Sequence, residues 1–217
     1  MARSKSSGNW LQRHVNDPYV KQAQKDGYRS RASYKLLQLH DKDRLIQPGM
    51  LVVDLGSAPG GWSQVAGNLV GARGKVVATD ILAMEPVKNV DFIQGDFREP
   101  EVLNQILECL SNRKPDLIIS DLAPNISGIP MADQAASMYL VELALDLARQ
   151  VLKSKGTFVA KVFQGAGSED YLRELRRSFE KLTIRKPPAS RPKSSEIYVV
   201  ARGFKATAPE QSAQYPG

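Results

Sequence analysis

Residues 51–62 read Leu-Val-Val-Asp-Leu-Gly-Ser-Ala-Pro-Gly-Gly-Trp, and this stretch decides the fold. Its first part, Leu51 to Leu55, is an apolar run of the length that buried strands have. The rest is a turn, in which Gly56 allows a tight bend and Gly60 and Gly61 leave room for a ligand close to the backbone. The stretch therefore predicts a strand that delivers a ligand-binding loop, as in open α/β sheets.

On both sides of this stretch, apolar runs of strand length alternate with patterns of helix length. We expect helices at 30–45, 61–70, 101–110, 133–153 and 169–181, and strands at 51–55, 76–80, 90–93, 116–121, 157–163, 182–186 and 196–201. Such alternation is typical of an α/β fold with a mainly parallel sheet and helices on both faces. The two last strands follow each other directly, which predicts seven strands with one antiparallel strand at an edge.

The length of 217 residues suits one such domain with short appendages. We expect a basic, partly flexible arm over 1–29, the domain over 30–205 and a flexible tail over 206–217. Cys109 has no cysteine partner, the two histidines lack zinc-ligand spacing, and no apolar run is long enough to cross a bilayer. These features predict a soluble, cytoplasmic protein without disulfides, a structural metal or a membrane span.

The net charge of +7 is concentrated in two runs of the chain. Residues 1–35 hold eight Lys or Arg against two Asp, and residues 173–193 hold eight Lys or Arg against two Glu. One such run alone would fit an ordinary solvated surface. Two runs that flank a nucleotide-type fold indicate a polyanionic partner such as nucleic acid.

Three acidic residues lie at the ends of the first three strands. Asp54 lies in the first strand, Asp80 ends the second and Asp96 follows the third, which suits ribose hydroxyls at Asp80 and an adenine amino group at Asp96. The loop lacks the G-x-G-x-x-G pattern of dinucleotide sites, and Pro59 has no N–H for a pyrophosphate. Asp54 would repel phosphate but suits the sulfonium or ammonium group of S-adenosylmethionine. The sequence therefore favours this cofactor over a nicotinamide dinucleotide.

A candidate catalytic pair lies at two further strand ends. Lys161 interrupts the apolar run 158–163, so its ammonium needs a partner, and Asp121 ends the neighbouring strand. Burial would lower the pKa of the lysine toward values useful to a general base, whereas the carboxylate would raise it, and the sequence leaves this balance open. A lysine that merely extends to solvent from the strand end is the alternative.

Two residues bear on the group that would be methylated. Cys109 falls in a helix among apolar residues, which indicates a core position rather than the thiolate that methylation of cytosine C5 needs. Asn125 stands where an aromatic ring could clamp a flipped base, which argues against methylation of an exocyclic amine. We therefore expect methylation of a ribose.

Five motifs occur together, and on them the chain resembles the FtsJ/RrmJ-type ribose 2'-O-methyltransferases over nearly its whole length: Ser33-Tyr-Lys35, Asp54-Leu-Gly-Ser-Ala-Pro-Gly-Gly-Trp62, Asp121-Leu-Ala-Pro-Asn125, Lys161-Val-Phe-Gln-Gly165 and Arg191-Pro-Lys-Ser-Ser-Glu196. The resemblance implies the Rossmann-like fold of class I S-adenosylmethionine-dependent methyltransferases. It places the family's catalytic tetrad on Lys35, Asp121, Lys161 and Glu196. It places the family's cofactor contacts on Gly60, Trp62, Asp80, Asp96 and Asp121.

In the reaction that the resemblance implies, a ribose 2'-hydroxyl attacks the cofactor methyl group and loses its proton to Lys161. Asp121 orients Lys161, Lys35 places the ribose or a phosphate, and Glu196 holds the lysine ends. The implied substrate is a uridine in the A loop of 23S rRNA, presented in the assembled large subunit to a monomeric enzyme. A relative acting on tRNA anticodon loops and a non-catalytic RNA-binding module remain the alternatives.

Overall fold

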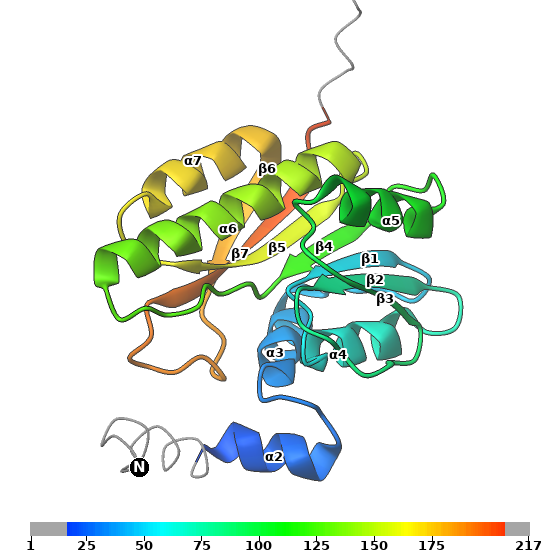
Figure 1. The fold of residues 1–217 in the computed structure, drawn as a ribbon, viewed down its shortest axis with the longest axis horizontal. Helices are drawn as coiled ribbons and strands as arrows, with labels where there is room; N and C mark the ends of the chain where they lie inside the picture. The colour runs from blue at the N-terminus through cyan, green and yellow to red at the C-terminus, as the bar shows by residue number, and fades with distance from the viewer. Residues whose placement is uncertain (1–16, 207–217) are drawn as a thin grey trace, which may run out of the picture.

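The computed structural model describes residues 17–206, whose centre is a seven-stranded sheet with the order β3-β2-β1-β4-β5-β7-β6 (Figure 1). The strands are β1 Leu51–Leu55, β2 Lys75–Asp80, β3 Val90–Gln94, β4 Leu117–Ser120, β5 Thr157–Phe163, β6 Phe179–Arg185 and β7 Glu196–Phe204. Strands β1 to β5 pair in parallel, and β7 pairs antiparallel with β5 and β6. The mainly parallel sheet is confirmed, with antiparallel β7 inserted next to the edge strand β6.

Two groups of helices cover the two faces of the sheet (Figure 1). One face carries α5 Pro100–Leu110, α6 Pro130–Val151 and α7 Ser168–Ser178, and the other carries α3 Ser33–Asp43 and α4 Gly61–Val70. Each face has its own buried apolar core, as a sheet covered on both sides requires. Among residues 17–206, no helix has the length and apolar character needed to cross a membrane.

One helix that the hydrophobic pattern did not predict, α2 Pro18–Asp26, lies within the expected basic arm. Asp17 caps this helix by accepting a hydrogen bond from Tyr19 N at 3.0 Å, and Gly27 ends it with a φ of +75°. Only Ala23 of the helix is buried, so the helix packs little apolar surface against the domain. The rest of the arm, residues 1–16, and the predicted tail from residue 207 onward lie outside the described residues.

The other predicted elements are confirmed within a few residues, and the clearest difference is the end of α7. The predicted helix 169–181 ends at Ser178, and Phe179 begins β6 instead. The Phe179 ring lies 6.1 Å from that of Phe158 and 5.4 Å from that of Phe204, the residue of β7 with which Phe179 pairs. Core packing therefore sets this boundary against the local helical pattern.

The pairing of β5 with β7 brings distant residues to one edge of the sheet. Its register sets Lys161 opposite Tyr198 and Phe163 opposite Glu196. The amino end of β7 thereby meets the carboxyl ends of the parallel strands, which is the edge where ligands bind in open α/β sheets.

Candidate active site

The loop after β1 is held in place by the end of β2. Gly56 N donates to Thr79 O at 3.0 Å, and Asp80 Oδ2 accepts from Ala58 N at 2.9 Å. Gly56 has a φ of +75°, and a Cβ at this position would stand 2.5 Å from Leu122 Cδ2. The conformation and the close approach both require glycine, so the tight turn predicted from the sequence is confirmed.

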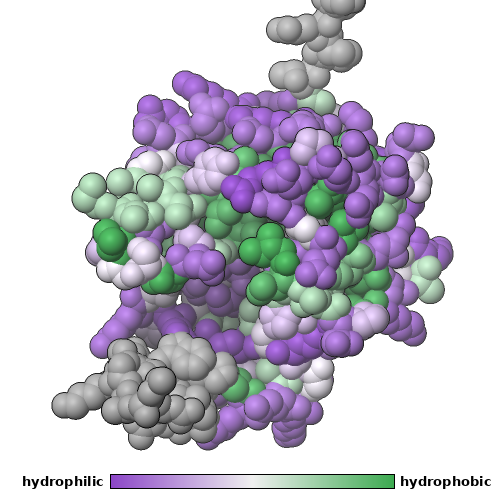
Figure 2. Space-filling view, in the orientation of Figure 1, coloured by the Kyte–Doolittle hydropathy of each residue, from purple (hydrophilic) through white to green (hydrophobic). Residues whose placement is uncertain are grey.

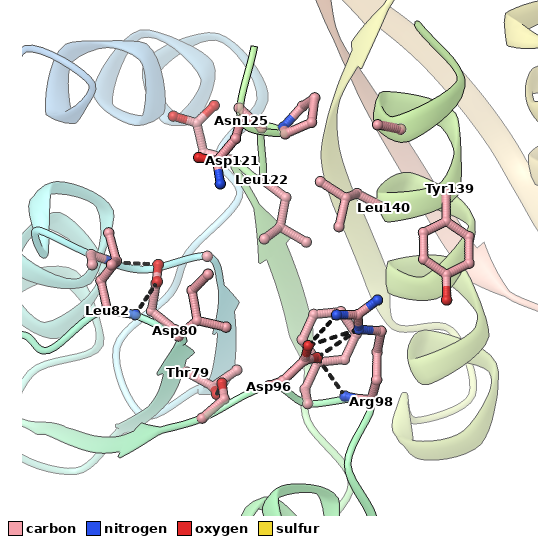
Figure 3. A pocket seen from close by; sticks show the side chains of 18 residues that line it. Thr79, Asp80, Leu82, Asp96, Arg98, Asp121, Leu122, Asn125, Tyr139 and Leu140 are labelled. Carbon is pink, nitrogen blue, oxygen red and sulfur yellow. Dashed lines mark hydrogen bonds and ion pairs between the residues drawn. The ribbon is translucent and has the colours of Figure 1, made fainter. Parts of the chain in front are cut away.

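A cavity of about 430 Å³ opens at the carboxyl ends of β1 to β4 (Figure 3). We call it the donor cavity, after the methyl donor that the sequence predicts. Its volume is within the roughly 300–1,000 Å³ of small-molecule sites. Asp80, Asp96 and Asp121 line it from three strand ends. In Figure 3, Asp121 and Asn125 lie on one side of the cavity and Asp96 with Arg98 on the other. The structure thus brings three of the predicted acids together around a space of ligand size.

Arg98 is a residue of the donor cavity that sequence reasoning missed. Its Nε lies 2.8 Å from both carboxylate oxygens of Asp96, and its guanidinium carbon lies 5.8 Å from the ring centroid of Tyr139. The hydrogen bonds from Arg98 hold the pKa of Asp96 below its usual range. Asp96 is therefore an ionised hydrogen-bond acceptor. The only signal in the sequence was an arginine two positions after the acid.

Asp54 lies in the interior and is not part of the cavity wall. Its Oδ2 accepts a hydrogen bond from Ser63 Oγ of α4 at 2.7 Å, and within residues 17–206 its Oδ1 has no partner. Burial raises the pKa of Asp54 to about 7, with a smaller contribution from the charges of Asp121 and Asp80. The contact with a cofactor cation that the sequence suggested is not supported by this placement, because the strand directs the side chain toward α4.

Gly60 and Trp62 also lie outside the cavity wall. A Cβ on Gly60 would stand 2.8 Å from Arg29 Nη1, so this glycine permits a close approach of the arginine. Trp62 is buried, donates from Nε1 to Ala32 O at 2.9 Å and lies 5.7 Å from the ring of Tyr198. In this structure, both motif residues contact other protein groups and do not face the cavity.

Arg29 joins two loops that border the donor cavity. Its guanidinium donates to Pro59 O at 3.3 Å, to Glu85 O at 2.6 Å and to Pro86 O at 2.7 Å. The sequence placed this arginine only in a general basic run, and its structural role depends on loops that are remote in the chain. Arg29 therefore acts on the site through the backbone of these loops.

The four residues of the expected tetrad form two ion pairs. Lys161 Nζ lies 3.1 Å from Asp121 Oδ1 and donates to Asp121 O at 2.8 Å. Lys35 Nζ lies 2.9 and 3.0 Å from the two carboxylate oxygens of Glu196. Lys35, Lys161 and Glu196 are each no more than 7% exposed. Because removal of one partner would leave a buried charge uncompensated, the folded protein holds these side chains firmly in place.

Tyr198 connects the two ion pairs. Its hydroxyl donates to Asp121 Oδ1 at 2.7 Å, and Lys35 Nζ lies 5.5 Å from its ring centroid. Burial raises the pKa of Tyr198 well above its usual value, and the charges of Asp121 and Glu196 add to this effect, so the hydroxyl keeps its proton. Sequence reasoning missed Tyr198, although its position two residues after Glu196 in one strand places both side chains on the same face.

Asp121 belongs both to the donor cavity and to the tetrad. Its residue lines the cavity, and its carboxylate contacts Lys161. The amine of Lys161 is therefore fixed beside a space of nucleoside size, which is the arrangement that a general base next to a bound ligand would need. Within the described part of the chain, the His, Cys, Asp and Glu side chains form no group of three that could hold a metal ion.

The second basic run does not form one surface. Helix α7 places the first arginines of residues 173–193 on the sheet face opposite α3, where two of them pair with acids of their own helix (Figure 1). Farther along the run, Arg191 lies 4.0 Å from Asp17, which also pairs with Arg31 at 2.8 Å. The expected second patch is therefore split, and only its later residues join the basic arm beside the tetrad.

A family model and several relatives match most of the chain. The model of the FtsJ-like methyltransferase family matches residues 28–204. Ribosomal RNA large subunit methyltransferase E of Stutzerimonas stutzeri is 67% identical, covering 94% of this chain and 100% of the relative, and that of Marinobacter nauticus is 66% identical, covering 94% and 99%. A Plasmodium falciparum crystal structure, described as a ribosomal RNA methyltransferase, superposes with a TM-score of 0.73 at 30% identity and covers 83% of this chain and 100% of its own. The chain therefore belongs to the FtsJ-like methyltransferase family.

Proposed function

We propose that this protein methylates the ribose 2'-hydroxyl of a uridine in the RNA of the large ribosomal subunit, with S-adenosylmethionine as donor. The pair of Lys161 and Asp121 carries the proposal, because it places a buried amine beside a cavity of nucleoside size. The name of the relatives, ribosomal RNA large subunit methyltransferase E, supports the substrate class. The family resemblance supports the finer part, the A loop of 23S rRNA in the assembled subunit.

The residues of the donor cavity fit S-adenosylmethionine, which supplies a methyl group on a sulfonium and carries no phosphate. Asp80 would accept hydrogen bonds from the ribose hydroxyls, and ionised Asp96 from the adenine amino group. Asp121 adds negative charge where the cavity approaches Lys161, which suits the cationic part of the donor. Leu122 and Leu140 add apolar side chains to the wall, which suit the adenine faces.

Lys161 would accept the proton of the 2'-hydroxyl, directly or through one water. The ion pair with Asp121 and the 6% exposure of Lys161 hold the amine in one place, largely away from bulk water. Two contacts to Asp121 fix the position of Nζ before the RNA arrives. Positioning of this kind supplies a large part of the rate in transfer reactions. The 2'-oxygen would bond to the methyl carbon as the carbon–sulfur bond of the donor breaks, and the Lys161 amine would take the proton of the hydroxyl.

Lys35 and Glu196 would position the acceptor strand. Lys186 Nζ donates to Glu196 O at 3.0 Å, so a second cation lies beside the pair of Lys35 and Glu196. A ribose that reaches Lys161 brings its flanking phosphates toward these cations, which would neutralise them. In this proposal Lys35 acts on ribose or phosphate placement, and Glu196 holds Lys35 in place.

Two other functions remain as alternatives. A tRNA anticodon loop would use the same donor and the same lysine, but the names of the relatives favour ribosomal RNA. A non-catalytic RNA-binding module would have no need for the buried pair of Lys161 and Asp121 beside the donor cavity. A nicotinamide-dependent dehydrogenase is disfavoured by the family match.

Large subunits from cells that lack this gene provide the test. Purified protein with S-adenosylmethionine should transfer methyl groups to these subunits, and mass spectrometry of the rRNA should show 2'-O-methyluridine in the A loop of 23S rRNA. Transfer to tRNA but not to subunits would contradict the ribosomal substrate. A methyl group on a base would contradict ribose chemistry, and absence of transfer to either RNA would favour the non-catalytic module.

A further inference from the structure

A second cavity of about 250 Å³ adjoins the donor cavity. It lies between the loop before α6, the first turns of α6 and the end of β5, and its lining includes Pro124, Ile126, Gln134, Ser137, Phe163 and Ser195. The volume is below the roughly 300–1,000 Å³ of pockets for drug-sized ligands. It therefore suits a group as small as one nucleobase.

Two residues connect this second cavity to the reaction. Pro124 lines both cavities. Phe163 lines the second cavity, and its ring centroid lies 5.7 Å from Lys161 Nζ. In a ribonucleotide, the base and the 2'-oxygen are attached to adjacent ribose carbons, so the base of the reacting nucleotide must lie next to the reacting oxygen. If that oxygen is at Lys161, the second cavity is the space beside it.

The rim of the second cavity carries large apolar side chains that are open to solvent. Ile126 lines the cavity and is 69% exposed, and Ile129 and Met131, close by in the chain, are 62% and 85% exposed. Figure 2 shows hydrophobic surface at the amino-terminal end of α6, where this segment lies. Gathered apolar side chains of this kind mark a binding surface, and a nucleobase out of its stack offers an apolar face.

Gln134 provides a polar group at the second cavity with a defined orientation. Its Nε2 donates to Phe163 O at 3.2 Å and to Ala166 O at 3.0 Å, so both amide hydrogens are used. Its Oε1 accepts no hydrogen bond from the residues between 17 and 206. This oxygen is available to a donor such as the N3–H of uracil.

We propose that the second cavity receives the base of the acceptor nucleotide, a uracil, unstacked from the RNA and packed against Ile126. The inference rests on the proposed function, because it takes the ribose at Lys161 as the reacting group. Removal of a base from its stack costs a few kcal/mol in a duplex and less in a loop, so the cavity favours an acceptor in a loop.

Ile126→Ser and Leu107→Ser form a matched pair for the test, since both change an exposed large aliphatic side chain and Leu107, on α5, lies outside both cavities. With unmethylated large subunits, Ile126→Ser should lower kcat/KM for methyl transfer roughly 5- to 100-fold, as loss of one base contact predicts. Leu107→Ser should stay within about twofold of wild type. Neither residue lines the donor cavity, so both variants should bind S-adenosylmethionine as wild type does.

The outcomes separate the two proposals. Transfer by the wild type with equal kcat/KM values for the two variants would overturn the second cavity as the base site and leave the proposed function intact. Loss of S-adenosylmethionine affinity in Ile126→Ser alone would overturn it as well, because the residue would then act on the donor. Wild-type protein that fails to methylate the subunits would overturn the proposed function and this inference with it.

Discussion

The donor cavity and the lysine cluster, defined as Lys35, Asp121, Lys161, Glu196 and Tyr198, are built in different ways. Most of the cavity is lined by short segments that directly follow β1 to β4, and each of these segments is a short stretch of sequence next to its strand. The cluster combines α3, β5, β7 and the end of β4, and its pair Lys35–Glu196 spans 161 positions of the chain. The binding loop is thus a local property of the chain, whereas the lysine cluster exists only in the folded protein.

The two regions also differ in how they hold charge. Asp80 of the donor cavity accepts hydrogen bonds from the main-chain N–H groups of Ala58 and Leu82, and no cation pairs with it among the described residues. In the lysine cluster, opposite charges lie side by side in a buried environment. Changes in the cavity should therefore act on donor affinity, and changes in the cluster on methyl transfer and stability.

Lys161→Ala should have the largest effect. Removal of a general base typically costs 10²- to 10⁴-fold in rate, so we expect kcat for methyl transfer to fall by about that factor. Affinity for S-adenosylmethionine should stay near that of wild type, because Lys161 does not line the donor cavity. Single-turnover transfer to unmethylated subunits and equilibrium dialysis measure the two quantities. Lys155→Ala, which removes an exposed lysine, is the control, and equal rates for both variants would exclude Lys161 as the base.

Glu196→Ala should cause the next largest change, in stability. It leaves the Lys35 ammonium buried without its partner, and loss of one member of a buried pair costs about 3–5 kcal/mol in the free energy of unfolding. Glu180→Ala breaks an exposed pair with Lys155 and should cost at most about 1 kcal/mol. Urea unfolding of both variants gives the comparison. Similar losses of unfolding free energy in the two variants would show that the buried pair of Lys35 and Glu196 contributes no more stability than the exposed pair.

Asp80→Ala should weaken S-adenosylmethionine binding about 10- to 100-fold, because a hydrogen bond to a charged group is worth about 1.5–3 kcal/mol. Affinity for RNA should not change, since Asp80 lies in the donor cavity. Asp91→Ala, on β3 and outside the cavity, is the matched control, and calorimetric titration measures both. An equal donor affinity in the two variants would contradict the assignment of Asp80 to the donor.

The parts of the molecule that could be predicted are those with a local signal. Apolar runs and helical periods predicted the sheet, and glycines with strand-end acids predicted the tight turn after β1 and the acidic side chains of the donor cavity. Three features had no such signal. Tyr198 joins the cluster only through the register of β7. Phe179 begins β6 because it packs in the core, although the local pattern would continue α7. Arg98 donates a hydrogen bond to Asp96, two positions before it in the chain. The partner of Lys35 came only from resemblance to a family, because spacing does not identify a residue so far along the chain.

Asp54 shows most directly what the sequence could not resolve, because in the sequence it resembles Asp80 and Asp121, and only the folded strand turns it away from the cavity. Because Asp54 lies outside the cavity wall, Asp54→Asn should bind S-adenosylmethionine within about twofold of wild type. A contact with the donor cation, as the sequence suggested, would instead weaken binding in the variant about 10-fold or more.

Asp54→Asn should also change the pH dependence of stability. The folded-state pKa of Asp54 is raised by burial to about 7, whereas the unfolded value is near 3.9, so between these values the folded protein binds the extra proton. The free energy of unfolding of the wild type should therefore fall as pH rises through this window, by up to about 1.4 kcal/mol per pH unit from this group. The asparagine side chain of the variant does not titrate, so the stability of Asp54→Asn relative to wild type should rise between pH 5 and 6.5. Parallel curves in urea unfolding would mean that Asp54 is ionised throughout and that the donor region, like the lysine cluster, compensates its buried charge.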